Sequence, residues 1–459
     1  MRADRGTQWA GRPARAVIAA IVVAGFAGAG VQGMPSSSAV AAPAVQTVVS
    51  LTFDDGTSDQ RIAAPIMQEL GMRGTFFVPS GFIGSPGYLT RDDLSRLAAA
   101  GHEIGGHTVL HPDLGTLPGE ELRRQICNDR ATLLGWGFQV SSFAYPFAVS
   151  TPEAEAVVKE CGYNSGRMLG DIRSRFGCEE CYYAAVIPPR DPYYTEAYDM
   201  VDSTWTIDDL KNAVVNAENA VIDEEKVPGW LQLTFHDFCI VECSSTATPL
   251  SMFTEFLRWL QPRATTNNTV VKTVAEVIGG PVQPAVVEPL PNPPAPGANG
   301  IVNPGLEELG GTGLPYCWGP ATYGDLEADF TLSPGRTGAV ASALTVSRHK
   351  EGDAKLVPQL DLGACAPTVI PGHRYFLHTW YTSTTVTQYS VYLRNSQGVW
   401  DYWLSSPWYE ASSDWASAEW VLPPIPEGST GISFGLALFE NGSLTTDDYR
   451  LYDVTVVEP

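Results

Sequence analysis

Two hydrophobic periodicities alternate along the first 280 residues of the chain. Short runs of apolar, β-branched and aromatic residues predict strands, and segments in which apolar residues recur every three or four positions predict helices. Because strands and helices alternate with short connections, the pattern predicts a parallel sheet, either open or closed into a barrel. The predicted strands are 47–53, 74–78, 102–106, 142–145 and 230–236, and the predicted helices are 58–70, 91–100, 119–134, 152–161, 207–222 and 250–260.

The periodicity changes after residue 300. Short alternating runs follow one another between Gly- and Pro-rich turns, and residues 301–459 contain no convincing helical pattern. This is typical of an all-β sandwich. Between the two parts, residues 281–300 contain seven prolines, so we expect an extended, semi-rigid linker that holds the sandwich apart from the first domain, residues 47–280.

The N-terminus has the pattern of a signal peptide. Four arginines lie within the first 15 residues, an apolar run follows over 16–31, and small residues at 39–41 offer a cleavage site. The alternative is a membrane anchor, but the run is shorter than the roughly 20 residues that a spanning helix needs. We therefore expect residues 1–41 to be removed, which leaves a secreted, extracellular or cell-wall-associated protein without a stable membrane span.

Charge and cysteine content narrow the class of partner and the compartment. The formal net charge of −23 argues against nucleic acid, because phosphate binding depends on Lys and Arg. Eight cysteines in an exported chain predict disulfides. The short spacings within 178–181 and 239–243 also fit a structural zinc site, although export favours disulfides. The candidate pairs are Cys127–Cys161, Cys178–Cys181, Cys239–Cys243 and Cys317–Cys365.

Residues capable of chemistry follow three of the predicted strands. Asp54 and Asp55 follow the first strand, His107 and His111 follow the third, and His236 ends a late one. In a parallel sheet the carboxyl ends of the strands meet, so we expect these side chains to gather there. A carboxylate and two imidazoles can hold a metal ion with open positions for water and substrate. A second, neighbouring carboxylate is then free to act as a base.

Four motifs carry a family resemblance. TFDDG (52–56), HTVLH (107–111), FAYPF (143–147) and LTFHD (233–237) resemble, in the same order, motifs of the polysaccharide deacetylases, which are the NodB-homology or family-four carbohydrate esterases. The resemblance covers about residues 47–280. It implies a distorted (β/α) barrel, a divalent metal ion that is usually zinc, and hydrolysis of N-acetyl or, less often, O-acetyl groups on glycans.

The resemblance also implies roles for individual residues. Asp55, His107 and His111 would bind the metal, Asp54 would be the general base on a metal-bound water, and His236 would be the general acid that protonates the leaving amine. Metal activation is needed because an amide carbonyl is a poor electrophile, and protonation is needed because an amine is a poor leaving group.

The third motif departs from the family pattern. Its segment from Tyr145 to Phe147 would contact the substrate, with a backbone N–H near Phe147 holding the oxyanion. Many members carry an arginine here that braces the catalytic aspartate, whereas this chain has Ala144. Arg190 in IPPRDPY is our candidate for a replacement, with a surface arginine as the alternative. The Asp-rich fourth motif, which tunes the acid histidine, has no clean counterpart.

The C-terminal part resembles carbohydrate-binding sandwich modules in NPGLE (303–307) and YRLYDV (449–454), which implies a jelly-roll-like domain. Its exposed aromatics would stack on sugars, although most aromatics in a sandwich belong to the core. Asp447 and Asp448 fit either a calcium site or a turn. The aromatic candidates are Tyr381, Trp400, Trp403, Trp408 and Trp415.

Taken together, the sequence predicts a secreted, zinc-dependent, monomeric polysaccharide deacetylase with a tethered β-sandwich, acting on an acetylated polysaccharide. The alternative is a non-catalytic glycan-binding protein on a deacetylase scaffold. Chitin-like polymers, peptidoglycan, poly-N-acetylglucosamine and acetylxylan are all compatible with these motifs.

Overall fold

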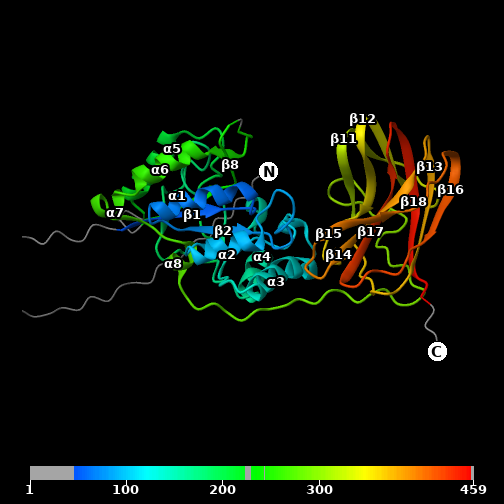
Figure 1. Ribbon diagram of the computed structural model, residues 1–459, viewed down its shortest axis with the longest axis horizontal. Helices are drawn as coiled ribbons and strands as arrows, with labels where there is room; N and C mark the ends of the chain where they lie inside the picture. The colour runs from blue at the N-terminus through cyan, green and yellow to red at the C-terminus, as the bar shows by residue number, and fades with distance from the viewer. Residues whose placement is uncertain (1–45, 223–228, 242, 456–459) are drawn as a thin grey trace, which may run out of the picture. The chain divides into compact units, whose positions relative to one another are not determined.

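A computed structural model of the protein describes residues 46–222, 229–241 and 243–455 (Figure 1). The predicted signal peptide, residues 1–41, lies outside the described residues. Within the described ranges, no helix combines the length and apolar character needed to cross a membrane.

The first domain is built on a mainly parallel sheet in the order β5-β4-β3-β2-β1-β7-β6. Among the described strands of this sheet, only β6 runs antiparallel to its neighbour, and β10 pairs with β1 beside this path. Among the described residues the end strands β5 and β6 do not pair with each other, so the barrel is incomplete. The predicted distorted (β/α) barrel is confirmed. The strands are β1 (Thr47–Phe53), β2 (Gly74–Val78), β3 (Glu103–Gly106), β4 (Ser142–Ala144), β5 (Ser165–Arg167), β6 (Ala185–Val186), β7 (Gly229–Phe235) and β10 (Thr269–Val271).

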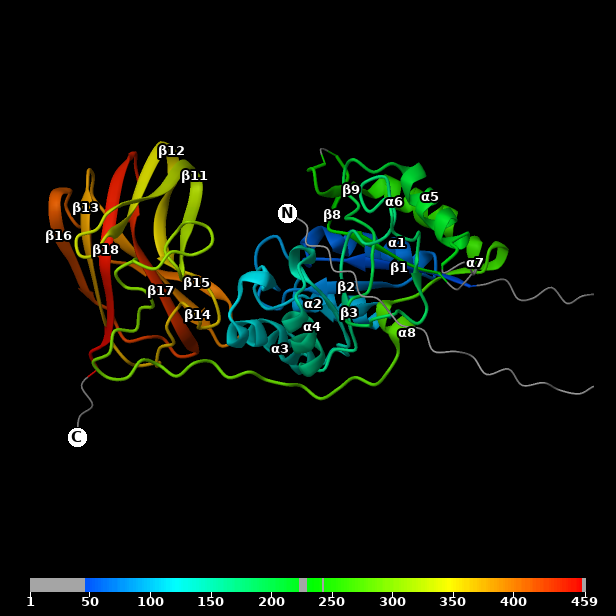
Figure 2. The ribbon, with the colours of Figure 1, turned by 180° about the vertical axis from the view of Figure 1, so that it is seen from behind.

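Helices alternate with these strands. The predicted helix over 58–70 is divided into a 3-10 turn, Ser58–Ile62, and a short helix, because Pro65 cannot donate the backbone hydrogen bond that would join them. Thr90 and Asp93 form a capping box at the start of α2. In Figures 1 and 2, α3 and α4 lie side by side, and Cys127–Cys161 links them. The helices are α1 (Ala63–Glu69), α2 (Arg91–Ala99), α3 (Gly119–Gly135), α4 (Pro152–Glu160), α5 (Ile207–Glu218), α6 (Leu250–Leu260), α7 (Arg263–Thr266) and α8 (Val274–Ile278).

The central strands are buried on both faces. All seven residues of β1 and all seven of β7 are buried, including polar residues such as Thr52 and Thr234, whose hydroxyl oxygens lie 2.9 Å apart. The ring of Phe53 stacks on that of Phe76, with the centroids 4.4 Å apart. This packing fixes the strands whose carboxyl ends carry the motif residues.

The C-terminal domain is all-antiparallel, as predicted for a sandwich. The long strand β12 pairs with β18 over Ser342–Val346 and with β17 at Ala354–Lys355. It thereby joins the group β18-β13-β16 to the group β17-β14-β15, with a core that includes Leu377, Tyr389 and Phe434. The strands are β11 (Trp318–Pro334), β12 (Val340–Pro358), β13 (Tyr375–Ser383), β14 (Gln388–Asn395), β15 (Trp400–Ser405), β16 (Ser412–Val421), β17 (Ser429–Leu438) and β18 (Gly442–Asp453).

The Pro-rich segment is extended, as expected, but it is not a free spacer. The Arg130 guanidinium on α3 donates to the carbonyl oxygens of Gln283 and Pro284. Asn128 on the same helix exchanges two hydrogen bonds with the backbone of Glu288. An extended backbone leaves its own polar groups unpaired, and the long side chains of α3 satisfy them.

Four disulfides are present: Cys127–Cys161, Cys178–Cys181, Cys239–Cys243 and Cys317–Cys365. They are the candidate pairs named from the sequence. The two closely spaced pairs, Cys178–Cys181 and Cys239–Cys243, which also fitted a zinc site, therefore form local disulfides.

Candidate active site

Three potential metal ligands converge at the carboxyl ends of β1 and β3. The Nε2 atoms of His107 and His111 are 3.1 Å apart, and Oδ1 of Asp55 lies 3.4 Å and 3.2 Å from them. Donor atoms bound at about 2.0–2.1 Å to a tetrahedral Zn²⁺ lie roughly 3.3 Å from one another. The three atoms already have the spacing that such an ion requires, so these residues fit the implied metal.

His107 is held in the tautomer that a metal ligand needs. Its Nδ1 lies 2.7 Å from the carbonyl oxygen of Ala144. An N–H there donates to the carbonyl and leaves the lone pair on Nε2, which faces Asp55 and His111. The backbone N–H of His107 donates to Asp129 Oδ2, and Asp129 also accepts from the N–H of Ser80. Burial raises the pKa of Asp129 to about 7, although these hydrogen bonds oppose the shift. We had not singled out Asp129 from the sequence.

The ligand segments have an unusual backbone. Asp55 and Thr108 both have φ of 70°, and His111 has φ of 55°, a left-handed region that costs non-glycine residues on the order of 1 kcal/mol or more. Hydrogen bonds hold the turn: the N–H of His111 donates to Thr108 Oγ1, and the N–H of Leu110 donates to Gln125 Oε1. Strain kept in place by such contacts is typical of functional segments.

Asp55 is poised as an anionic ligand. Burial alone would raise its pKa, but the contacts with the neighbouring His107 and His111 side chains outweigh burial and hold the pKa far below its usual value. Burial lowers the pKa of the His111 imidazole despite its contact with Asp55. A carboxylate beside an imidazole that resists protonation is the state in which both groups can bind a cation.

Asp54 is buried, with 2% of its surface exposed, and forms an ion pair with Arg167 through Oδ2. Arg167 ends β5, is 1% exposed, and also lies 3.3 Å from Thr234 Oγ1. Its guanidinium carbon lies 5.3 Å from the ring centroid of Phe77. The arginine therefore fixes the orientation of Asp54 from within the core.

The proposed role of Arg190 as the brace of this aspartate is wrong. Arg190 lies with its guanidinium 5.6 Å from the ring centroid of Tyr182, and Arg167 holds the position beside Asp54. We missed Arg167 because β5, Ser165–Arg167, is only three residues long and carries no run of apolar residues. Its position after a helix in the repeating β–α order was the signal that could have found it.

His236 directly follows β7, and its Nε2 lies 3.9 Å from Asp54 Oδ2. Gln60 Nε2 donates to its carbonyl oxygen at 2.9 Å. Its buried Nδ1 has no hydrogen-bond partner among the described residues, which agrees with the lack of a clean fourth motif in the sequence. Oδ2 of Asp54 therefore faces both Arg167 and the candidate acid, His236.

The third motif contains one buried aromatic residue and one exposed aromatic residue. Tyr145 is 1% exposed, and its hydroxyl donates to the carbonyl oxygen of Tyr193 at 2.8 Å, so its side chain anchors the turn in the core. Phe147 is 66% exposed, has φ of 55°, and places its ring 4.6 Å from that of His111. Of this pair, only the Phe147 side chain flanks one of the potential metal ligands, His111.

The aromatic candidates of the C-terminal domain also differ in exposure to solvent. Tyr381 is a core residue, and Trp400 Nε1 donates to the carbonyl oxygen of Asp361. Trp403 packs partly buried against the core, Trp415 is half-buried, and Trp408 is 52% exposed. Asp447 and Asp448 lie within β18, at an irregularity in its pairing with β13, and their carboxylate oxygens accept hydrogen bonds from Arg336 and Thr337.

Comparison with known proteins finds similarity to the same family in the segment that holds Asp54, Asp55, His107 and His111. Residues 41–166 match the family model of polysaccharide deacetylase. A chitooligosaccharide deacetylase of Rhizobium leguminosarum bv. trifolii is 35% identical over 80 residues, 17% of this chain and 35% of that protein. A chitin deacetylase of Pestalotiopsis sp is 30% identical over 122 residues, 26% of this chain and 40% of that protein. A peptidoglycan-N-acetylglucosamine deacetylase of Bacillus cereus (strain ATCC 14579) is 34% identical over 91 residues, 19% of this chain and 31% of that protein.

The matched region spans less than half the length of each of these relatives. Among solved structures, the Xyl-CE4 domain of a multidomain xylanase from the hindgut metagenome of Trinervitermes trinervoides aligns with a TM-score of 0.34 at 18% identity, covering 50% of this chain and 89% of that one. The resemblance to the polysaccharide deacetylases is confirmed for the segment that holds Asp54, Asp55, His107 and His111.

Proposed function

We propose that the chain is a secreted, metal-dependent deacetylase of polysaccharides. The observation that carries this proposal is the convergence of Asp55, His107 and His111 beside a second, arginine-braced carboxylate, Asp54. The donor set of two imidazole nitrogens and one carboxylate oxygen suits Zn²⁺, and we propose zinc as the ion.

The side chains around this group support hydrolysis of an acetyl amide. When bound, the metal ion polarises the acetyl carbonyl and lowers the pKa of water. Asp54 accepts the proton of the attacking water, and Arg167 orients Asp54 through their ion pair. As the new C–O bond forms and the C–N bond breaks, His236 delivers a proton to the leaving nitrogen. The products are acetate and a free amine.

The proposed substrate is a polymer of N-acetylglucosamine. The three relatives compared above are named for chitin, chitooligosaccharide and peptidoglycan N-acetylglucosamine. The formal net charge of −23 disfavours strongly anionic polymers and tolerates a neutral polymer that becomes cationic as acetate leaves. The backbone N–H near Phe147 is the proposed oxyanion donor, and the exposed Phe147 ring is proposed to contact the sugar next to the reacting acetyl group.

The test is acetate release by the purified, zinc-loaded protein from chitooligosaccharides, peptidoglycan, poly-N-acetylglucosamine and acetylxylan, with zinc content measured on the same sample. We expect about one zinc per chain and acetate from at least one N-acetylated polymer. Glycan binding without acetate release from any of the four would favour the alternative, a glycan-binding protein on a deacetylase scaffold. Release from acetylxylan alone would redirect the proposal to O-acetyl groups.

A further inference from the structure

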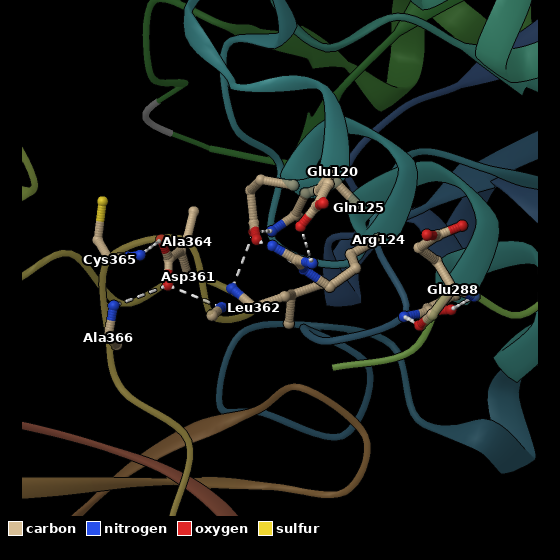
Figure 3. A network of polar contacts seen from close by, with 12 residues as sticks. Glu120, Arg124, Gln125, Glu288, Asp361, Leu362, Ala364, Cys365 and Ala366 are labelled. Atoms are coloured by element: carbon tan, nitrogen blue, oxygen red, sulfur yellow. Dashed lines mark hydrogen bonds and ion pairs between the residues drawn. The ribbon is translucent and has the colours of Figure 1, made fainter. Parts of the chain in front are cut away.

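A continuous chain of hydrogen bonds connects the C-terminal sandwich to the segment that carries two metal ligands. The backbone N–H of Leu362 donates to Glu121 Oε1 at 2.8 Å (Figure 3). Gln125 Nε2 donates to the same oxygen at 2.9 Å. Gln125 Oε1 in turn accepts from the N–H of Leu110 at 3.0 Å, between His107 and His111. Each link is therefore a direct contact.

The residues of this chain are deeply buried. Glu121 and Gln125 are each 1% exposed, and Leu362 is 2% exposed. Water therefore cannot replace a lost partner at low cost. The second oxygen of Glu121 accepts from Arg124 Nε at 3.1 Å, so the buried carboxylate is neutralised within its own helix, α3, and is held in one orientation. A buried ion pair whose carboxylate also accepts from a neighbouring loop fixes geometry more than it adds stability.

On the sandwich side of the contact, hydrogen bonds also hold the loop that carries Leu362. Asp361 accepts from the N–H groups of Gly363, Cys365 and Ala366, which folds the loop so that the Leu362 N–H points outward. The fully buried Arg394 on β14 donates from Nη1 to the carbonyl oxygen of Asp361 at 2.8 Å. The loop that donates to Glu121 is therefore locked to the sandwich core.

A second contact reaches the same segment independently. Gly398, in the turn between β14 and β15, lies so close to Val109 that an added Cβ would come within 2.8 Å of Val109 Cγ1. The N–H of Val109 donates to the backbone carbonyl of Gln125. Two consecutive residues between the ligands, Val109 and Leu110, are thus held by α3, and the sandwich touches both Val109 and the side chain network of Gln125.

From these contacts we propose that the sandwich positions the metal-binding segment His107–His111 through Leu362, Glu121 and Gln125. This inference rests on the proposed metal site. It assigns positioning roles to Glu121 and Gln125, which act through the segment and touch neither metal nor substrate. Because the backbone at Thr108 and His111 is strained, the segment is expected to change conformation once these contacts are lost. Removal of residues that orient metal ligands typically weakens metal affinity about 10–100-fold.

The experiment uses the full chain and two readouts: the zinc dissociation constant, from competition with a chromophoric chelator, and amide hydrogen exchange of residues 107–111 in the metal-free protein. Gln125→Leu removes both side-chain hydrogen bonds at nearly constant volume. Arg394→Met unlocks the 361–366 loop from within the sandwich. We expect both variants to raise the zinc dissociation constant about 10-fold or more and to speed exchange over the segment.

Two controls separate positioning from general loss of stability. Leu133→Ala opens a cavity in the same helix, since Leu133 is fully buried in the core. Lys355→Met removes an equally buried cation of the sandwich, one that pairs with Asp353. Both should leave the zinc dissociation constant within about two-fold. An unchanged constant and exchange rate in Arg394→Met would overturn the proposal, even if Gln125→Leu were impaired. A wild-type protein that binds no zinc would contradict the proposed function instead, and the exchange measurement would still decide the inference.

Discussion

Arg167, the last residue of β5, pairs with Asp54, the first residue after β1, and both side chains are almost fully buried. The two residues are 113 positions apart in the sequence. The third motif, which would be expected to supply such an arginine, has Ala144 in that position. The arginine that braces Asp54 therefore comes from β5, the strand beside β4.

This pair predicts the behaviour of Arg167→Met. Loss of the guanidinium leaves the buried carboxylate of Asp54 without its cationic partner and without the contact that orients it. Turnover should fall by about 10²-fold or more, while zinc stays bound. Arg190→Met is the matched control and should retain near wild-type turnover. The reverse result, with Arg190 essential and Arg167 dispensable, would contradict the arrangement described here.

Phe147 predicts a different kind of defect. Phe147 is 66% exposed, so Phe147→Ala should cost little stability. Because the ring flanks His111, its loss should raise KM on N-acetylated oligosaccharides several-fold and leave zinc content unchanged. Steady-state kinetics and elemental analysis of the same preparation test this. A loss of zinc would mean that the ring supports the ligand instead of the sugar.

The buried imidazole of His102 should make the free energy of unfolding depend on pH. Burial lowers its pKa to about 4, while the unfolded chain retains an ordinary value of about 6.5. The fold therefore holds the neutral imidazole, whose Nδ1 accepts from the N–H of Gly74. The contribution of His102 is complete above pH 6.5 and is lost as the pH falls toward 4, amounting to about 2 kcal/mol between pH 7 and pH 5.

His102→Asn keeps an acceptor for Gly74 but cannot be protonated in this range. Urea unfolding at pH 7 and pH 5 should show a smaller loss of the free energy of unfolding in the variant than in the wild type. Equal losses in both proteins would show that His102 is not the responsible group.

Local pattern predicted most elements of the first domain, because its strands are long, apolar and regularly spaced. The bounds of β1, β2 and α6 agree with the sequence prediction. The local pattern did not predict β5, because Ser165 and Gly166 give no strand signal. For this reason Arg167 was not among the predicted site residues. The ligands could be grouped from the sequence because parallel strands bring their carboxyl ends together.

The contacts of the Pro-rich segment could not be predicted in the same way. Composition indicates an extended backbone but says nothing of what lies beside it. The partners, Asn128 and Arg130, are polar residues of a helix more than 150 positions earlier in the chain. For the same reason, the sequence suggested a tethered sandwich, while Leu362 is hydrogen-bonded to α3.

The neighbouring aspartates have different proposed roles, and one comparison tests the whole account. Asp55 lies 3.2–3.4 Å from the two imidazoles, whereas Asp54 pairs with Arg167. The measurement is acetate release per bound zinc by the wild type, Asp54→Asn and Asp55→Asn on the best N-acetylated substrate. Asp54→Asn should keep its zinc and lose about 10²–10⁴-fold in turnover, and Asp55→Asn should lose zinc affinity. An Asp54→Asn protein that releases acetate at the wild-type rate with its zinc in place would contradict the account.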